Sequence, residues 1–434
     1  ASLVGQLYPA GDRRIDPAYT IFYMGINVGG ALGPFLCGFF GDTGNPADFK
    51  WAFLVAGIGM LMSVLVQFLF QKKYLVNAEG QSIGVEPENT SKKILKPLLI
   101  AIGMAVFASF MVSIFFIDSK VFSIITYLLI FSLLIILFII FRDPTLTILE
   151  KKKVGVIFIV SFFVVFFWSA FEQAGASLTF FADEQTNRYI GLNIPGWMVY
   201  VLSALVVFLT YKMYLKARKN LSSNDVLLRN VVYILLGLLT VGIIYGDIYF
   251  FRNGMQNLIM DEIPASFFQS LNSTYVVLFA PVFAWLWIKV GKYDPSSPTK
   301  MALGLFLLAL GYLWIAIGVK GVEPGMKVSM MWLAGLYMLH TWGELCLSPI
   351  GLSLVNKLAP IKLASLMMAV WYLANAFANK LAGQLSALYP AGKTTQFLGF
   401  TMNNMYDFFI LFVILSGTAS LLLFLLTRWL QKLM

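Results

Sequence analysis

The sequence has few of the groups on which water-soluble enzymes depend. Only 12% of its 434 residues are charged, and it contains one histidine and two cysteines. A soluble globular domain usually carries about twice that charged fraction. Hydrophobic residues make up 59% of the chain, and the mean hydropathy is +0.81. This composition excludes a water-soluble domain, because so much apolar surface cannot be hidden in a core of its own and lipid must cover much of it.

The missing motifs narrow the possible functions. Cys37 and Cys346 both lie in apolar stretches, where we expect small buried side chains rather than a disulfide or metal site. The chain has no HExxH or GxSxG motif and no repeated pore-loop signature. We therefore expect neither an enzyme nor a channel, and no cofactor or metal.

Long apolar runs dominate what is present. A membrane-spanning helix needs about 20 apolar residues, and twelve runs qualify: 18–41, 51–70, 97–117, 120–141, 154–176, 197–217, 229–251, 264–290, 301–319, 329–355, 362–386 and 407–430. They are continuous and do not alternate, which favours helices over strands within the spans. The predicted fold class is an all-α polytopic membrane protein.

The basic residues predict the orientation of these spans. If the loop carrying Arg13 and Arg14 is cytoplasmic and the sides alternate, 23 of the 31 Lys and Arg residues fall in cytoplasmic loops. Seven fall outside and Lys380 lies within a span. This threefold excess agrees with the positive-inside rule and predicts a cytoplasmic C-terminus. The polar stretch 71–96 is expected to be a flexible cytoplasmic linker. Residues 1–8 are expected to be the cytoplasmic end of a preceding helix, so a fragment is suspected.

Two acids and the single histidine lie inside predicted spans, where an ionisable group costs about 2.5–3.5 kcal/mol on insertion scales. Glu172 and Glu344 are candidates for a proton or substrate site. Glu172 could instead be an interfacial acid at the end of its span. His340 shares a helix face with Glu344, four residues later, although a histidine bonded to a neighbouring carbonyl would look the same. Lys380 can extend to the interface, and Asp247 is expected to be solvated.

The 18–41 span carries a stripe of small residues at every fourth position. Gly25, Gly29, Gly33, Cys37 and Gly41 form overlapping GxxxG motifs, which let another helix approach closely. Tyr23 and Asn27 lie one turn apart in the same span. A buried asparagine needs partners, so Asn27 is expected to face a helix or a cavity, as is Asn272 in a later span. Scattered acids, amides and aromatic residues of this kind favour a transporter.

Five stretches, in order along the chain, resemble signatures of the proton-dependent oligopeptide transporter (POT) family of the major facilitator superfamily. They are residues 12–14 with 19–29, residues 167–177, residues 269–272 with 280–281, residues 343–353 with 357–360, and residues 371–373.

The resemblance implies a major facilitator-type bundle in which two six-helix halves rock around a central site. It also implies proton-coupled symport of di- and tripeptides. By position, Glu172 resembles the family's proton-coupling acid, and Glu344 resembles the acid that binds the peptide amino terminus with help from Asn27 and Asn272. The remaining predicted site residues are Tyr23, Trp168, Trp371 and Ser348 for substrate and, as a second proton-coupling candidate, His340.

The resemblance also implies a partition of the chain, with the first three and a half family helices missing. Residues 1–70 would be the remainder of the N-terminal half, 71–96 the linker, and 97–153 an extra helix pair. Residues 154–196 would hold the seventh helix and an outer loop, 197–251 an inserted pair of unknown role, and 252–434 the eighth to twelfth helices. The family's first-helix arginine and fourth-helix lysine, which bind the peptide carboxylate and pair with Glu172, would lie in the missing part.

The predicted function is thus a proton-driven peptide symporter in the inner membrane, monomeric and without nucleic-acid partners. The alternative is a related transporter for another small solute, such as nitrate or a peptide-like drug. A membrane-embedded enzyme is disfavoured.

Overall fold

The computed structural model describes residues 7, 15–42, 45–77, 80, 83, 102–106, 109, 113, 120–220, 226–252, 254, 256–323 and 325–434. Most of the predicted 71–96 linker and of the predicted 97–117 span, and nearly all of the 1–8 segment, lie outside these residues.

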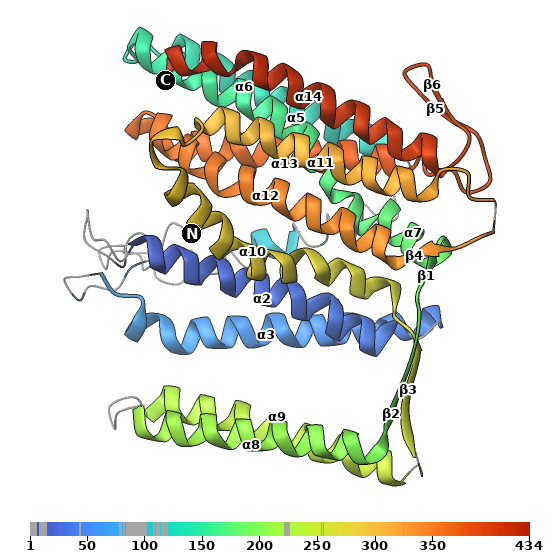
Figure 1. Cartoon of the computed structure of the whole chain (residues 1–434). Helices are drawn as coiled ribbons and strands as arrows, with labels where there is room; N and C mark the ends of the chain where they lie inside the picture. The colour runs from blue at the N-terminus through green and yellow to red at the C-terminus, as the bar shows by residue number, and fades with distance from the viewer. Residues whose placement is uncertain are drawn as a thin grey trace. The chain divides into compact units, whose positions relative to one another are not determined.

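Long helices account for eleven of the twelve predicted spans (Figure 1). Among the described residues these are α2(Ile15–Gly41), α3(Phe49–Tyr74), α5(Lys120–Arg142), α6(Ile148–Phe171), α8(Gly196–Asn220), α9(Val226–Arg252), α10(Gln269–Val290), α11(Ser297–Val319), α12(Met330–Leu358), α13(Ala364–Ser386) and α14(Met405–Leu433). Eight of the described helical segments are long and apolar enough to cross a membrane. Helix α12 is not among them, because His340, Glu344 and several other polar residues lower its hydropathy. The number of spans therefore stays a prediction.

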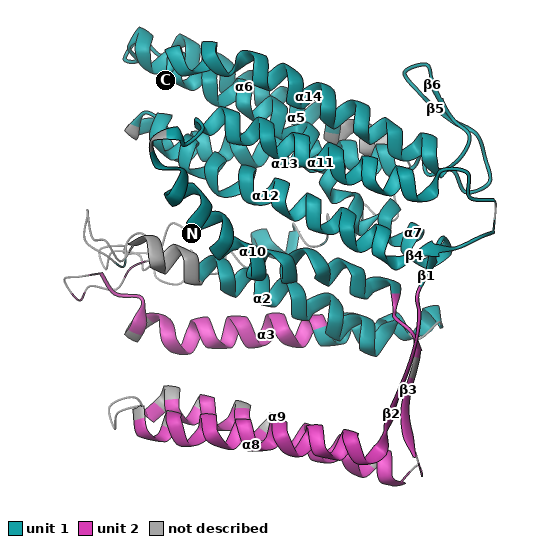
Figure 2. Cartoon of the chain, viewed as in Figure 1, with its two compact units in different colours: residues 1–55, 84–187, 265–434 teal, residues 56–83, 188–264 magenta. Residues whose placement is uncertain are grey.

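The chain divides into two compact units (Figure 2). Unit 1 comprises residues 1–55, 84–187 and 265–434, and unit 2 comprises residues 56–83 and 188–264. This division by packing does not test the functional partition predicted from the sequence.

The core of unit 1 is built around α11. This helix packs against α12 and α14, and α6 packs against α13 and α14. The α11–α12 contact depends on two glycines: a Cβ added to Gly304 or to Gly343 would lie 2.7 Å from the other's carbonyl oxygen. Close backbone approach of this kind is typical of small residues in membrane helices. Because Glu344 directly follows Gly343, this close approach fixes the position of Glu344 relative to α11.

Helix α6 begins with a capping box and ends in a 3₁₀ turn. Thr147 and Glu150 form a reciprocal capping box at its start. The helix ends at Phe171 and passes into a 3₁₀ turn, η2(Glu172–Gly175), followed by the short helix α7(Ser177–Glu184). The predicted 154–176 span is therefore α-helical only to Phe171. Glu172 is the first residue of the turn.

Short strands occur in the connections, which the sequence did not predict. In unit 1, β1(Thr186–Asn187) pairs in parallel with β4(Val328–Ser329), and β5(Thr395–Phe397) forms a hairpin with β6(Phe400–Met402). The described spans themselves are helical, as predicted.

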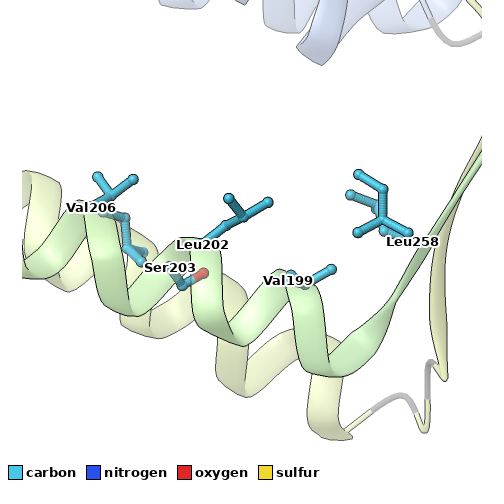
Figure 3. A pocket seen from close by; sticks show the side chains of 7 residues that line it. Val199, Leu202, Ser203, Val206 and Leu258 are labelled. Atoms are coloured by element: carbon cyan, nitrogen blue, oxygen red, sulfur yellow. The ribbon is translucent and has the colours of Figure 1, made fainter.

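Unit 2 contains the predicted inserted helix pair. A two-stranded antiparallel ribbon, β2(Tyr189–Pro195) with β3(Asn257–Glu262), leads into and out of the α8–α9 hairpin. The Ser203 hydroxyl on α8 donates to the Asp247 carboxylate on α9 at 2.8 Å. Asp247 is half-buried and bonded to the neighbouring helix, instead of being merely solvated as expected. Beside Ser203 lies a small pocket lined mainly by apolar residues (Figure 3): Ile194, Val199, Leu202, Val206, Ile243 and Leu258.

Candidate functional site

Glu344 lies at the centre of a polar cluster within unit 1. Its side chain is held on α12 and the residue is only 9% exposed. Asn272 on α10 donates from Nδ2 to Glu344 Oε2 at 2.9 Å and to Thr341 Oγ1 at 3.0 Å. Thr341 in turn donates to the Tyr337 carbonyl one turn earlier. Three of these residues lie on one face of α12, and α10 closes the cluster from the side.

Helix α2 reaches the same carboxylate. The Tyr23 hydroxyl donates to Glu344 Oε1 at 3.4 Å, a long hydrogen bond. Asn27, one turn along and 7% exposed, donates from Nδ2 to the Tyr23 carbonyl at 3.0 Å. The structure thus brings together Glu344, Asn272, Tyr23 and Asn27, four of the substrate-binding residues predicted from the sequence. Asn27 contacts its own helix rather than the carboxylate.

No cation neutralises Glu344 among the residues that the structure describes, since none of the ion pairs there involves it. Burying a lone carboxylate costs several kcal/mol unless it is paired or protonated. The two donors, the Asn272 amide and the Tyr23 hydroxyl, offset only part of this cost. The charge of the carboxylate is therefore not compensated by a cation within the described cluster.

Glu172 is exposed at the surface of the described bundle. The turn that carries it is fixed by its neighbour Gln173, which is fully buried. Gln173 Nε2 donates to the carbonyls of Ser169 and of Ala382 on α13, at 3.1 and 3.0 Å. Glu172 has no ion pair in the described part of the chain.

The other predicted substrate residues occupy three helices. The indole nitrogen of Trp168 on α6 and the hydroxyl of Ser348 on α12 are buried, and neither has a hydrogen-bond partner in the described structure. Trp371 on α13 is 3% exposed and packs directly against Gly351 of α12, so in this conformation it fills a helix contact. The Trp168 indole could donate one hydrogen bond, and the Ser348 hydroxyl could donate or accept one.

His340 is 1% exposed and lies one turn before Glu344, as its spacing predicts. Its ring lies against Tyr312 of α11 and Phe171 of α6, with centroids 4.7 and 6.1 Å away. Its Nε2 atom is buried without a partner among the described residues.

Helices α2 and α10 meet along a seam beyond the cluster. Ser270 donates to the Ala31 carbonyl at 2.8 Å, and Asp42 accepts from the Ser266 hydroxyl at 3.0 Å. Gly30 and Gly38 lie where any Cβ would collide with Ser273 or with Ser266 and Phe267. Within the described structure, Gly25, Gly29 and Gly33 of the predicted stripe have nothing within 4 Å of a Cβ position, whereas Gly41 packs on Ala52. The packed face of α2 is thus offset by one residue from the predicted stripe over most of its length.

Sequence reasoning missed Thr341 and Gln173. Thr341 could have been found because it lies three residues before Glu344 on the same helix face. Gln173 gave no signal of this kind, since its partner Ala382 is 209 residues away.

Comparison with known proteins identifies the family. The sequence profile described as the POT family matches residues 1–243 and 247–402. The chain belongs to the POT family. It is 29% identical over 406 residues to the uncharacterized transporter YclF of Bacillus subtilis (strain 168), covering 92% of this chain and 66% of that protein. It is 27% identical over 392 residues to the peptide transporter YePEPT of Yersinia enterocolitica, covering 88% of this chain and 63% of that protein.

Solved structures agree. The crystal structure of a peptide transporter POT in complex with sulfate matches with a TM-score of 0.66 and 26% identity, over 100% of this chain and 72% of that one. The predicted major facilitator-type helical membrane fold is thereby confirmed, and so are the family resemblance and the prediction that the protein is not an enzyme. The chain spans about two thirds of the length of the curated relatives that it matches.

Proposed function

We propose that the protein carries di- and tripeptides across the cytoplasmic membrane together with protons, by alternating access. The observation that carries this proposal is the buried Glu344 carboxylate, which Asn272 and Tyr23 hold in place while no cation of the described chain neutralises it. A peptide's terminal ammonium group is a cation with donors that match a carboxylate and neighbouring amides. Of the two relatives described above, the one whose name states a substrate class, YePEPT, is a peptide transporter, which agrees with this chemistry.

In this mechanism Glu344 binds the peptide amino terminus, assisted by Asn272, Asn27 and Tyr23. Trp168, Ser348 and Trp371 line the path of the rest of the peptide. The unpaired Trp168 and Ser348 groups support this role, because a passing peptide bond could satisfy each of them.

Glu172 takes up and releases the coupling proton. Its support is its position in a turn that interrupts a membrane helix, without an ion-pair partner in the described part of the chain. Broken helices of this kind form ion sites in transporters. The proton gradient, not a cofactor, drives the cycle, and each charge that crosses gains about 2.3 kcal/mol per 100 mV. We expect a monomer with a cytoplasmic C-terminus.

The test is dialanine binding to the full-length protein and its Glu344→Gln variant, which keeps the shape and removes the charge. We expect a loss of affinity of about tenfold or more, since a charge-assisted contact is worth roughly 1.5–3 kcal/mol. Glu323→Gln, which removes an exposed acid from a loop, is the matched control and should bind as the parent does. Equal affinity of Glu344→Gln and the parent would refute the assignment.

Competition distinguishes peptides from other solutes. Unlabelled dialanine should displace a labelled dipeptide at micromolar to millimolar concentrations, whereas nitrate should not. The opposite ranking would indicate a family relative that moves a different solute.

A further inference from the structure

His340 sits between the two acids of the proposed transport cycle and contacts neither of them directly. The imidazole ring lies beside Tyr312 of α11 and Phe171 of α6. It lies at 52° to the Tyr312 ring and at 33° to the Phe171 ring. One histidine therefore contacts the two helices next to its own, and one of them is the helix that ends at Glu172.

Helix α11 has a glycine, Gly311, at the point where the imidazole packs against it. A Cβ added to Gly311 would lie 2.5 Å from His340 Cδ2 and 2.9 Å from its Nε2. Real Cβ atoms do not approach other atoms this closely, so any other residue at position 311 would push the imidazole out of place. The position of the ring thus depends on a glycine of another helix.

The same contacts hold the last turn of α6. Phe171, against which the imidazole lies, is the final residue of that helix. The Tyr312 hydroxyl, beside the imidazole, donates to the Ala170 carbonyl at 2.6 Å. A shift of His340 therefore displaces the two residues that directly precede Glu172.

The surroundings suit a neutral ring. From α11 the imidazole is faced by Gly311 and Tyr312, and from α6 by Phe171. On α12 the nearest charge is Glu344, one turn away, and Glu172 lies beyond Phe171. A charged imidazolium with no carboxylate in contact would be costly in such a place. Shape and packing, rather than charge, are what this site can use.

We propose that His340 is a positioning residue that couples Glu344 to Glu172, by transmitting movements of α12 through Phe171 and Tyr312 to the turn that carries Glu172. The inference rests on the proposed symport. It assigns to His340 a mechanical part in proton coupling and assigns the proton itself to Glu172.

The test uses the full-length protein in liposomes, with two assays of radiolabelled dialanine. Counterflow measures exchange without a gradient, and accumulation under an imposed pH gradient measures coupling. The variants are Gly311→Ala, His340→Ala and the double variant. Gly155→Ala on α6 is the matched glycine control, because no neighbour among the described residues lies within 4 Å of its Cβ position. His340→Asn, which cannot titrate and keeps a polar side chain at this position, completes the set.

We expect Gly311→Ala and His340→Ala each to lower driven accumulation by about tenfold while counterflow stays within about threefold of the parent. The double variant should be no worse than His340→Ala, because the added methyl enters the space that the ring has left. His340→Asn should recover at least a third of the driven accumulation, and Gly155→Ala should match the parent.

Three results would overturn the inference: driven accumulation in His340→Ala within twofold of the parent, single-variant losses that multiply in the double variant, or a pH midpoint of driven accumulation in His340→Asn moved by more than about one unit. The last would mean that His340 carries the proton. A parent protein that transports dialanine in neither assay would instead refute the proposed function.

Discussion

Replacing Asn272 with alanine should weaken peptide binding far more than replacing Tyr23 with phenylalanine. Both side chains donate to the Glu344 carboxylate, Tyr23 to Oε1 and Asn272 to Oε2. Asn272 does so at 2.9 Å and also holds Thr341, whereas the Tyr23 hydroxyl lies 3.4 Å from its acceptor. Their unequal geometry gives the two substitutions unequal effects.

The magnitude follows from the kind of hydrogen bond. A well-formed hydrogen bond to a charged group contributes roughly 1.5–3 kcal/mol, which corresponds to about 10- to 100-fold in affinity. Asn272→Ala should therefore weaken dialanine binding by about that factor, because the carboxylate is no longer held for the incoming ammonium. An O–H···O contact of 3.4 Å lies beyond the usual 2.5–3.0 Å range. Tyr23→Phe should cost less than about threefold.

Isothermal titration calorimetry of the purified protein at one fixed pH measures both variants. Thr274→Ala is the control, since this exposed residue of α10 bonds the Ser270 carbonyl of its own helix and has no other hydrogen bond in the part of the chain that the structure describes. The reasoning is refuted if Tyr23→Phe binds more weakly than Asn272→Ala, or if Asn272→Ala binds like the parent.

Three further predictions concern the rest of the described fold. Gly38→Ala should reduce dialanine uptake by about tenfold, because its methyl collides across the α2–α10 seam, while Gly33→Ala, which meets no described neighbour, should not; equal uptake would contradict this packing. The hydrogen bonds from Thr145 and Lys362 lower the pKa of Asp143 to about 2. Its contribution to stability is therefore present above about pH 4 and lost as the pH falls towards 2. The thermal midpoint of Asp143→Asn should lie below that of the parent at pH 7 and approach it below pH 4, and a constant difference would exclude this contact. Asp247→Ala should increase protease cleavage within the α8–α9 hairpin, because Ser203 loses its acceptor, and unchanged cleavage would show that this bond does not stabilise the hairpin.

Much of the candidate site could be predicted from sequence because lipid makes polar residues conspicuous. Glu344, Asn272, Tyr23 and Asn27 each interrupt an apolar run and each need a partner. The structure places Asn272 and Tyr23 as donors to the Glu344 carboxylate, while Asn27 bonds the Tyr23 carbonyl on the same helix.

What could not be predicted depends on contacts between distant segments. The end of α6 at Phe171 involves Gln173 bonded to Ala382 and Tyr312 bonded to Ala170, neither of which leaves a periodic signal. The small-residue stripe of α2 was predicted from its spacing, but it is not the face of α2 that packs against α10. Helical periodicity identified a face of small residues, yet it could not tell that Gly30 and Gly38, on the adjacent face, receive α10.

The hydrogen bond between the two helices of the inserted hairpin could not be predicted from the sequence either. Asp247 near a predicted span boundary suggested solvation, and only the fold reveals that Ser203, 44 residues earlier, provides its donor. Spacing predicts which residues share a helix face, whereas partners on other helices follow from the packing of the whole bundle.

The central claim is that Glu172 carries the coupling proton while Glu344 binds the peptide. It is tested most directly by radiolabelled dialanine accumulation in liposomes that contain the full-length protein and its Glu172→Gln variant. Glu172→Gln should retain counterflow and lose accumulation driven by an inward proton gradient. Gradient-driven accumulation at the level of the parent would contradict it.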